Sequence, residues 1–473
     1  MLKKSFSTKL FSSGLQAIAV QVLGSAFFYL ISIYLTKQSF GTISLMNAAS
    51  IFLTTLLGFG LEQVVVRRIA ASKISDWAAA AFFIHSSFGV LITFFLLLLM
   101  NAMFKETTEN IRFLPWFFAA QGVILIGVSL KQFLNAKEKF LPYGIISVFS
   151  NLAKIAAAIW LLQKQMLSIQ TVAVLLLATA LFELLCLITY LLFKTTFRFK
   201  FHFKAYGKLV KESGAQYLSV IFDMSLSRMD WLLLGMMTSG AVLADYSFAY
   251  RAFELARLPI FMIAPVILPR LSRLMASNKT PGQLQQSPIN AFNSVELFFA
   301  VMIPLSLNIL WTPLVGMITH DKYGSSNSWQ FLVLSCCIPL QFFINLLWSL
   351  CFGAKKYKAV STITIICAIT NVVLNVILIP ELKGSGAAIA FFATTLLQGL
   401  LYYRLVYREV MEITIRPLLV FSFLALIVYG LVIRIPVHFS LQWLIALAFY
   451  ILAAFLSGQI NSRYIYHFKN FLA

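Results

Sequence analysis

Long apolar runs separated by short polar segments make up nearly the whole chain. An α-helix needs about 20 residues to cross the hydrocarbon core of a bilayer, and fourteen runs approach or exceed this length. They lie near residues 12–36, 42–66, 78–103, 113–135, 143–165, 170–193, 213–237, 242–270, 290–318, 328–352, 357–379, 385–404, 416–434 and 439–460. The pattern predicts an all-α polytopic membrane protein with about fourteen transmembrane helices.

The composition agrees with this prediction, since 60% of the 473 residues are hydrophobic and 11% are charged. The net charge of +21 suggests nucleic acid as a partner until the basic residues are placed. If the N-terminus is cytoplasmic, 26 of the 37 Lys and Arg residues, Lys131 among them, fall in cytoplasmic segments. The positive-inside rule explains this excess. We therefore expect cytoplasmic N- and C-termini and no nucleic-acid partner. The first run is too long for a cleaved signal and reads as a helix.

Two long cytoplasmic segments, Lys194 to Glu212 and Arg270 to Asn290, interrupt an otherwise compact succession of helices. The first divides twelve helices into two sixes. Segments around "SFGTISLMNAASIFLTTLLGFG" and "LADYSFAYRAFELARLPIF" also align at an offset of 204, which favours an internal duplication. We predict four regions: a six-helix bundle over 1–193, a basic cytoplasmic linker over 194–212, a second six-helix bundle over 213–405, and helices thirteen and fourteen with a cytoplasmic tail over 406–473.

The seventh apolar run carries a polar stripe at bilayer depth. At about 100° per residue, its members project within roughly 80° of one another. They are Gln216, Ser219, Asp223, Ser227 and Asp230. A charge facing lipid costs about 3 kcal/mol or more, so the stripe should line a cavity or a helix interface. Arg228 lies on a different face of the same helix.

The eighth run carries Arg251, Glu254 and Arg257 at i, i+3 and i+6, which favours a charge cluster on one side. The offset of 204 matches Arg251 to Asn47, so the corresponding face of the second helix is polar but uncharged.

In the first half, Lys154 and Glu183 lie near the middle of adjacent runs. They form either a buried ion pair or a proton or substrate site. Four basic and four acidic side chains lie near midspan, so the interior as a whole has no excess of positive charge that would attract anions.

Several chemical functions lack a signature in the sequence. The five cysteines fall in apolar runs without metal-ligand spacing. No phosphate-binding Gly-x4-Gly-Lys-[Ser/Thr] motif is present. We expect no cofactor, no metal site and no catalytic residues.

Three stretches resemble a known family. They are "FGTISLMNAASIFLTTLLGFGLEQVVVRRIA", "RMDWLLLGMMTSGAVLADYSFAYRAFELARLPIFMIAPVILPRLSR" and "NVVLNVILIPELKGSGAAIAFFATTLLQGLLYYRLVYR". Their order and spacing resemble the polysaccharide transporter branch of the multidrug/oligosaccharidyl-lipid/polysaccharide (MOP) flippase superfamily, the Wzx-type flippases of O-antigen or capsule repeat units. The resemblance covers about the first 410 residues. It departs from the family at Leu243-Ala244-Asp245, where a Val-Gly pair is common.

The resemblance implies two six-helix bundles with pseudo-two-fold symmetry, as in MATE transporters, plus two C-terminal helices. It implies a flippase that moves an undecaprenyl-pyrophosphate-linked oligosaccharide across the bacterial cytoplasmic (inner) membrane for surface polysaccharide assembly. Membrane lipids, a polysaccharide polymerase and the chain-length machinery are the other implied partners.

The candidate site follows from the same resemblance, which places charged residues of helices seven and eight in the cavity. The candidate substrate-binding residues are Arg228, Arg251, Arg257, Asp223, Asp230, Glu254 and Asn47. The candidates for ion coupling are Asp223, Asp230, Glu183 and Lys154. Arginine can bind a pyrophosphate through two parallel hydrogen bonds, so we expect the three arginines to attract the anion.

Three alternatives differ in substrate or in class. A cation-coupled MATE-type antiporter would share the fold but should have a more acidic cavity, and a lipid II-type flippase would differ mainly in its substrate. A membrane-embedded polymerase or glycosyltransferase would need a large outside loop or a catalytic acidic motif. The outside loops here are about ten residues long at most, which disfavours such an enzyme.

Overall fold

The computed structural model describes residues 2–71, 76–103, 111–195, 197, 199, 201–260, 271 and 286–459. Side chains are described from Gln16 on, except those of Ala17, Ile111, Ala215 and residues 286–288. Most of the predicted Arg270–Asn290 loop and the tail beyond residue 459 lie outside these ranges. The chain divides into two compact units, Met1–Ser247 and Phe248–Ala473.

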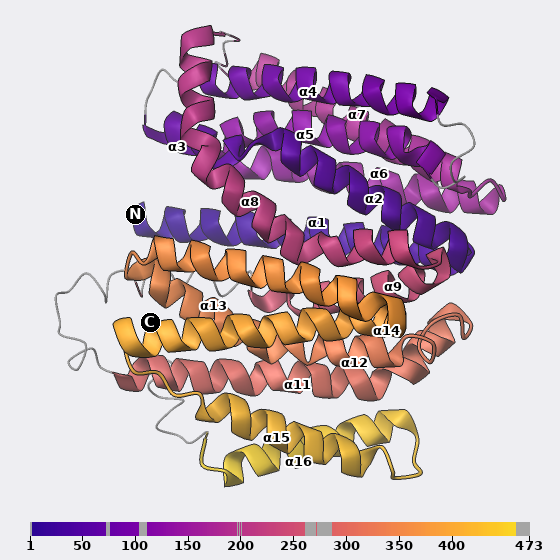
Figure 1. Cartoon of the computed structure of the whole chain (residues 1–473), viewed down its shortest axis with the longest axis vertical. Helices are drawn as coiled ribbons and strands as arrows, with labels where there is room; N and C mark the ends of the chain where they lie inside the picture. Colours follow the sequence, from indigo (N-terminus) through magenta and orange to yellow (C-terminus); the bar gives the residue numbers. More distant parts are fainter. Residues whose placement is uncertain are drawn as a thin grey trace. The chain divides into compact units, whose positions relative to one another are not determined.

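Unit 1 is a bundle of apolar helices (Figure 1). Its helices are α1 Leu2–Tyr34, α2 Lys37–Gly58, α3 Leu61–Ala71, α4 Asp76–Met103, the short 3-10 helix η1 Ile111–Phe113, α5 Leu114–Ala136, α6 Phe140–Gln163, α7 Ile169–Lys194, α8 Phe203–Met237 and the first turns of α9 Gly240–Ala256. Helix α5 lies centrally and packs against α2, α4 and α7. Local signals set the helix starts: the Thr36 hydroxyl caps α2, and Ser168 and Thr171 form a capping box on α7.

The second predicted helix is broken where it meets α8. Phe59 and Gly60 both have positive φ, 49° and 66°, and separate α2 from α3. A Cβ at Gly60 would lie 2.6 Å from the backbone nitrogen of Tyr217, so only glycine fits both the conformation and the contact. The Phe59 ring stacks on Tyr217 at a centroid distance of 4.2 Å. The break therefore lets α8 approach closely.

Helix α8 begins earlier than the apolar pattern indicates. It starts at Phe203, so the second half of the basic segment 194–212, which we predicted as a linker, is helical. Two contacts hold this part. The His85 Nδ1 atom lies 2.7 Å from the Tyr206 hydroxyl, and Arg68 at the end of α3 forms an ion pair with Glu212. These contacts supply the stabilisation that the polar sequence alone would not.

Unit 2 contains the remaining helices (Figure 1). They are the last turns of α9, then α11 Gln286–Thr319, α12 Ser328–Ser335, α13 Cys337–Gly353, α14 Tyr357–Glu409, α15 Arg416–Val432 and α16 Phe439–Leu456. Helix α11 packs against α12, α13, α15 and α16, so the two C-terminal helices that we predicted lie against this one helix.

Helix α14 is two helices joined by a tight reversal. Lys383 has the non-helical values φ 52° and ψ −130°. The Asn371 amide lies 3.5 Å from the Thr394 hydroxyl, although 23 residues of continuous helix would separate them by about 35 Å. The chain therefore folds back at Lys383, and α14 accounts for two predicted transmembrane segments.

The predicted fold class is confirmed. Every one of the fourteen apolar runs overlaps a helix, and no strand occurs among the described residues. Nine helical segments among the described residues are long and apolar enough to cross a membrane; one of them joins α12 and α13, and another is the reversed helix α14. The protein is a multi-pass membrane protein. The number of fourteen transmembrane helices stays a prediction.

Candidate functional site

The polar stripe of α8 divides into an accessible part and a buried end. Asp223 is exposed, and Gln216 and Ser219 are partly exposed. Asp230, in contrast, is 1% exposed and accepts hydrogen bonds from the Tyr246 hydroxyl and from the backbone N–H of Trp231. The stripe thus does not act as one surface: its buried end joins α8 to α9.

Arg228 projects toward the aromatic side of α8, away from Asp223 as the helical spacing predicts. Its guanidinium carbon lies 4.9 Å from the centroid of the Trp231 ring.

Close contacts join the first turns of α9 to α2. A Cβ on Gly41 would overlap the carbonyl of Gly240, so glycine at 41 permits backbone contact. Lys37 lies 2.7 Å from Asp245, and the hydroxyls of Ser44 and Ser247 lie 3.2 Å apart.

Asn47 lies further along α2, half-buried, and its carbonyl oxygen accepts a hydrogen bond from Gln121 of α5 at 2.9 Å. No charged side chain is seen in contact with Asn47 among the described residues. This face of α2 is polar and neutral, as the repeat alignment predicts.

The basic partner of Glu183 differs from our expectation. Lys131 of α5 lies 2.6 Å from the Glu183 carboxylate, and the Ser147 hydroxyl donates to the same oxygen at 2.6 Å. Lys154 instead donates to Asn151 at 2.8 Å and lies 5.2 Å from the centroid of the Phe27 ring. It still acts on Glu183 electrostatically. Two lysines therefore surround one carboxylate inside unit 1.

The predicted cluster on α9 forms within unit 2. Arg251 Nη1 donates to Glu254 Oε2 at 2.9 Å, and both side chains are largely buried, with 15% and 8% of their surface exposed. Arg257 directly follows α9 and donates to the Gln341 side-chain oxygen of α13 at 2.9 Å. Its guanidinium also lies 5.3 Å from the Phe253 ring centroid. Since Glu254 is engaged by Arg251 and Gln341 is neutral, the three charged side chains Arg251, Glu254 and Arg257 together carry a net charge of +1.

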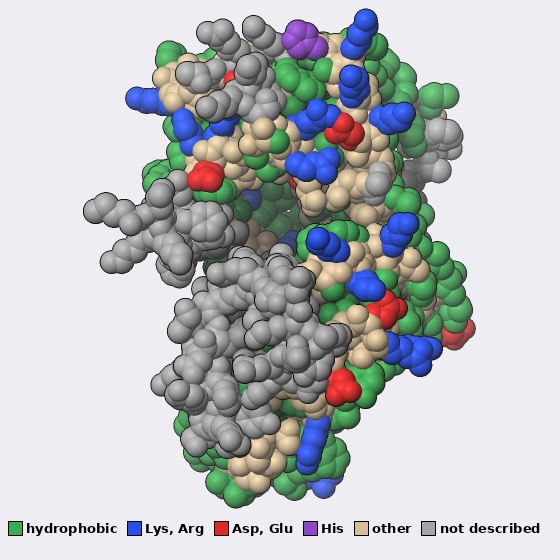
Figure 2. Space-filling view, turned by 90° about the vertical axis from the view of Figure 1, so that its left-hand side faces the viewer, with side chains coloured by type: hydrophobic (Ala, Val, Ile, Leu, Met, Phe, Trp, Pro, Cys, Tyr) green, Lys and Arg blue, Asp and Glu red, His purple; other side chains and the backbone are tan. Residues whose placement is uncertain are grey.

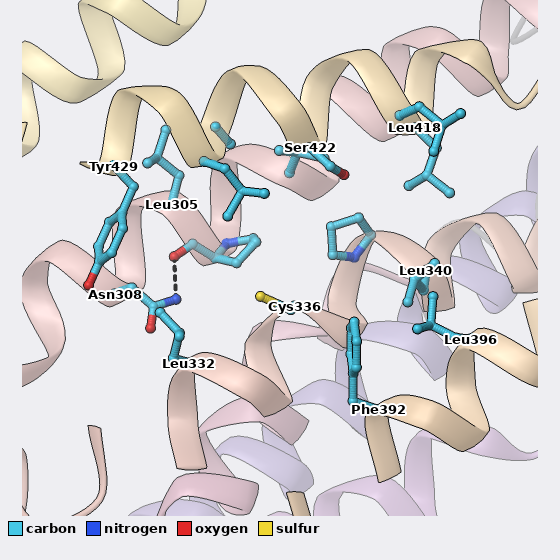
Figure 3. A pocket seen from close by; sticks show the side chains of 16 residues that line it. Leu305, Asn308, Leu332, Cys336, Leu340, Phe392, Leu396, Leu418, Ser422 and Tyr429 are labelled. Atoms are coloured by element: carbon cyan, nitrogen blue, oxygen red, sulfur yellow. Dashed lines mark hydrogen bonds between the residues drawn. The ribbon is translucent and has the colours of Figure 1, made fainter. Parts of the chain in front are cut away.

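Unit 2 also contains an apolar cavity of about 290 Å³ between α11, α12, α13, α14 and α15. Figure 3 shows Leu418 and Ser422 of α15 on one side and Leu340 and Phe392 on the other. Asn308 supplies polar atoms, but its amide donates to the Pro304 carbonyl at 2.8 Å and to Ser335 at 2.7 Å. The cavity therefore suits a hydrocarbon ligand.

Basic side chains gather at one end of the helices in both units. Figure 2 shows many Lys and Arg and few Asp and Glu on this face. Glu212 and Glu409 are among the acids of these helix ends, and each is already paired with a basic residue. The basic residues that the sequence places in loops thus lie together at the ends of the helices.

Three charged side chains within the helix bundles, one buried and two partly buried, were missed or misplaced from the sequence. Lys131 belongs to the interior of the bundle rather than to a loop. Glu62 of α3 accepts from Gln132, and Glu296 of α11 is 5% exposed. Both glutamates lie inside apolar runs, so scanning every run for acids would have found them. The balance of four against four therefore does not describe the interior.

Within the described residues, no group of three or more His, Cys, Asp or Glu side chains is arranged to hold a metal ion.

The comparisons with known proteins come from sequence and from structure. The model of a family described as "Polysaccharide biosynthesis protein" matches residues 6–275. No sequence among proteins with curated descriptions matches the chain.

Three similar solved structures illustrate the fold. The lipid II flippase MurJ, in an inward closed conformation, is 16% identical with a TM-score of 0.73, covering 96% of this chain and 98% of that one. An inward-facing multidrug resistance MATE family transporter of the MOP superfamily is 16% identical with a TM-score of 0.65, covering 82% and 94%. A MOP superfamily transporter from Pyrococcus furiosus is 15% identical with a TM-score of 0.56, covering 84% and 95%. These similar structures are flippases and transporters rather than enzymes, and the chain shares their fold.

Proposed function

Because the chain belongs to the family of polysaccharide biosynthesis proteins, we propose that it is a flippase for a lipid-linked oligosaccharide. The substrate is an undecaprenyl-pyrophosphate-linked repeat unit, such as that of O-antigen or capsule. The protein moves it from the inner to the outer leaflet of the bacterial cytoplasmic membrane.

One observation carries the proposal: Arg257 lies within unit 2 with no carboxylate partner among the described residues. Its one hydrogen-bond acceptor is the neutral Gln341, and its Nε atom is buried with no partner. An arginine in a low-dielectric site with donors to spare is a strong binding group for a phosphate anion. Arg251 lies less than two turns away and is held in place by Glu254.

The remaining candidate residues take different roles in this proposal. Within unit 1, Arg228 stays a candidate for binding the anion, and exposed Asp223 bonds sugar hydroxyls or carries a coupling proton. Asp230 and Glu254 position their neighbours, because each is nearly buried and already engaged. Asn47 bonds a sugar hydroxyl. Lys154 and Glu183 stay candidates for ion coupling, now together with Lys131.

The lipid part of the substrate needs an apolar environment. The cavity lined by Leu418 and Phe392 can hold part of a polyprenyl chain, since nearly all its lining atoms are carbon. Burying each CH₂ group there contributes about 0.8 kcal/mol relative to water, but much less relative to lipid. The cavity therefore serves to position the chain rather than to provide affinity.

In each unit we assign the end of the helices with many basic side chains (Figure 2) to the cytoplasm by the positive-inside rule. Both termini are then cytoplasmic. Delivery of the repeat unit to the outer leaflet also makes a polysaccharide polymerase and chain-length machinery the natural partners downstream.

The experiment compares export in cells that carry Arg257→Gln, Arg257→Lys or Arg404→Gln in place of the wild-type gene. Surface glycan and lipid-linked repeat units are quantified at equal protein levels in the membrane. Arg257→Gln should lose most export, and Arg257→Lys should keep part of it because the charge remains. Arg404 on α14 is exposed and lies outside the candidate site, so Arg404→Gln is the matched control and should export normally.

Normal export by Arg257→Gln would contradict the role of this arginine. Deletion of the gene separates the whole proposal from the alternatives. If the deletion leaves the glycan and its lipid intermediates unchanged but alters resistance to small organic cations, a MATE-type antiporter is the better description. If the deletion instead stops lipid II transport, the substrate of the flippase is lipid II.

A further inference from the structure

A buried carboxylate outside the candidate site lies on α11 in unit 2. Glu296 is 5% exposed, and neither of its carboxylate oxygens has a hydrogen-bond partner among the described residues. An ionised carboxylate without a compensating partner is strongly disfavoured inside a protein. The hydroxyl of Tyr450, on the neighbouring α16, is used elsewhere, since it donates to the Phe298 carbonyl at 3.0 Å.

A second buried acceptor lies one turn away on the same face of α11. Asn293 is 0% exposed, and its side-chain oxygen also has no partner within the described part of the chain. Residues three apart on a helix are neighbours, so Asn293 and Glu296 present their oxygens on one face. All three orphaned atoms are acceptors, which means that the group matching them is a cation or a hydrogen-bond donor.

The orientation of the Asn293 amide is set by its other contact. Its Nδ2 group donates to the Thr414 carbonyl at 3.0 Å, while the Asn290 side-chain oxygen accepts from the Thr414 N–H at 3.2 Å. Rotating the Asn293 amide by 180° would put its oxygen against the Thr414 carbonyl. The free oxygen is therefore a consequence of the hydrogen bonding and not of an arbitrary assignment.

The number and kind of donors decide which cation fits. Divalent ions usually take several carboxylates, but Glu296 belongs to no described group of three His, Cys, Asp or Glu side chains. One carboxylate and one amide oxygen match a hard monovalent cation, which prefers oxygen ligands. We propose that Glu296 and Asn293 form a binding site for a monovalent cation, with sodium as the probe.

The site connects to the transport path through Thr414. The two asparagines hold the connection between α14 and α15, and α15 forms one wall of the apolar cavity. A cation bound at Glu296 would therefore stiffen the joint that positions this wall. That coupling rests on the proposed flippase function, whereas the binding of the cation does not.

The test uses the purified full-length protein without substrate. Binding of ²²Na⁺ and thermal unfolding are measured in sodium, potassium or choline chloride at constant ionic strength. Wild-type protein should bind sodium saturably and unfold at a higher temperature in its presence. Glu296→Gln should weaken sodium binding at least about tenfold, equivalent to about 1.4 kcal/mol. Glu409→Gln removes an exposed carboxylate of the same unit and should leave binding unchanged.

A second measurement needs no variant and covers the case in which Glu296→Gln fails to fold. Dicyclohexylcarbodiimide modifies buried carboxyl groups, and mass spectrometry locates the modified residue. Sodium, but not choline, should slow the modification of Glu296 in the wild-type protein. Equal modification rates with equal unfolding temperatures in the two salts would overturn the site, as would sodium binding that persists in Glu296→Gln. Loss of glycan export with intact sodium binding would count against the flippase function alone.

Discussion

The contact between Lys131 and Glu183 allows a quantitative test of the packing inside unit 1. The lysine nitrogen lies 2.6 Å from the carboxylate oxygen, with 23% and 15% of the two side chains exposed. At an effective dielectric constant of about 20, the Coulomb attraction is about 6 kcal/mol before the cost of desolvation. Desolvation offsets most of this, so we expect a net coupling free energy of about 2 kcal/mol.

Two double-mutant cycles measure this coupling. One combines Lys131→Met with Glu183→Gln, and the other combines Lys154→Met with Glu183→Gln. The assay is reversible unfolding in mixed detergent micelles, which gives the free energy of unfolding of each variant. The Ser147 hydrogen bond to Glu183 is common to both cycles, so it does not affect their difference.

The expected coupling is about 2 kcal/mol with Lys131 and below about 1 kcal/mol with Lys154, whose ammonium donates to Asn151 and acts on Glu183 electrostatically. The double substitution should destabilise the protein by less than the sum of the two single substitutions, because each single substitution leaves one buried charge uncompensated. Stronger coupling to Lys154 would refute the arrangement described here and restore the pair expected from the sequence.

Three further predictions concern other contacts. Gly41→Val should destabilise the protein by about 1–3 kcal/mol, because the valine side chain would overlap the Gly240 carbonyl. Gly24→Ala is the control and should not destabilise the protein, since no atom lies within 4 Å of the added Cβ; thermal unfolding of both variants measures the difference. Tyr246→Phe should lower the free energy of unfolding by about 1–3 kcal/mol because buried Asp230 loses a donor, while Tyr407→Phe, at an exposed tyrosine, stays near wild type. Ala425→Trp should fill the apolar cavity and reduce glycan export at normal protein levels. Leu431→Trp, on the exposed side of α15, is the control and should not reduce export. Equal export by the two variants would exclude the cavity from the transport path.

The helices were predictable because each is specified by its own stretch of sequence. Bilayer length and continuous apolarity define each run, and every run overlaps a helix in the structure. The ion pair between Arg251 and Glu254 follows from i, i+3 spacing on one helix, which fixes the approach of the two side chains.

Other features depend on packing between helices and could not be predicted in this way. Whether Lys131 or Lys154 contacts Glu183 is decided by the rotation of α5 and α6 against α7, which helical periodicity does not specify. Asp230 belongs to the polar stripe by angle, yet the partner that buries it, Tyr246, comes from the next helix. The early start of α8 depends on contacts with His85 and Arg68, both distant in sequence.

The most direct test of the central claim is the distribution of lipid-linked oligosaccharide between the two leaflets. Cells are depleted of the protein, and the intermediates are quantified after labelling of the outer leaflet with a membrane-impermeant reagent. If the protein is the flippase, undecaprenyl-pyrophosphate-linked repeat units should accumulate, unlabelled, on the cytoplasmic side while surface glycan disappears. Intermediates that continue to reach the outer leaflet at the normal rate would contradict it.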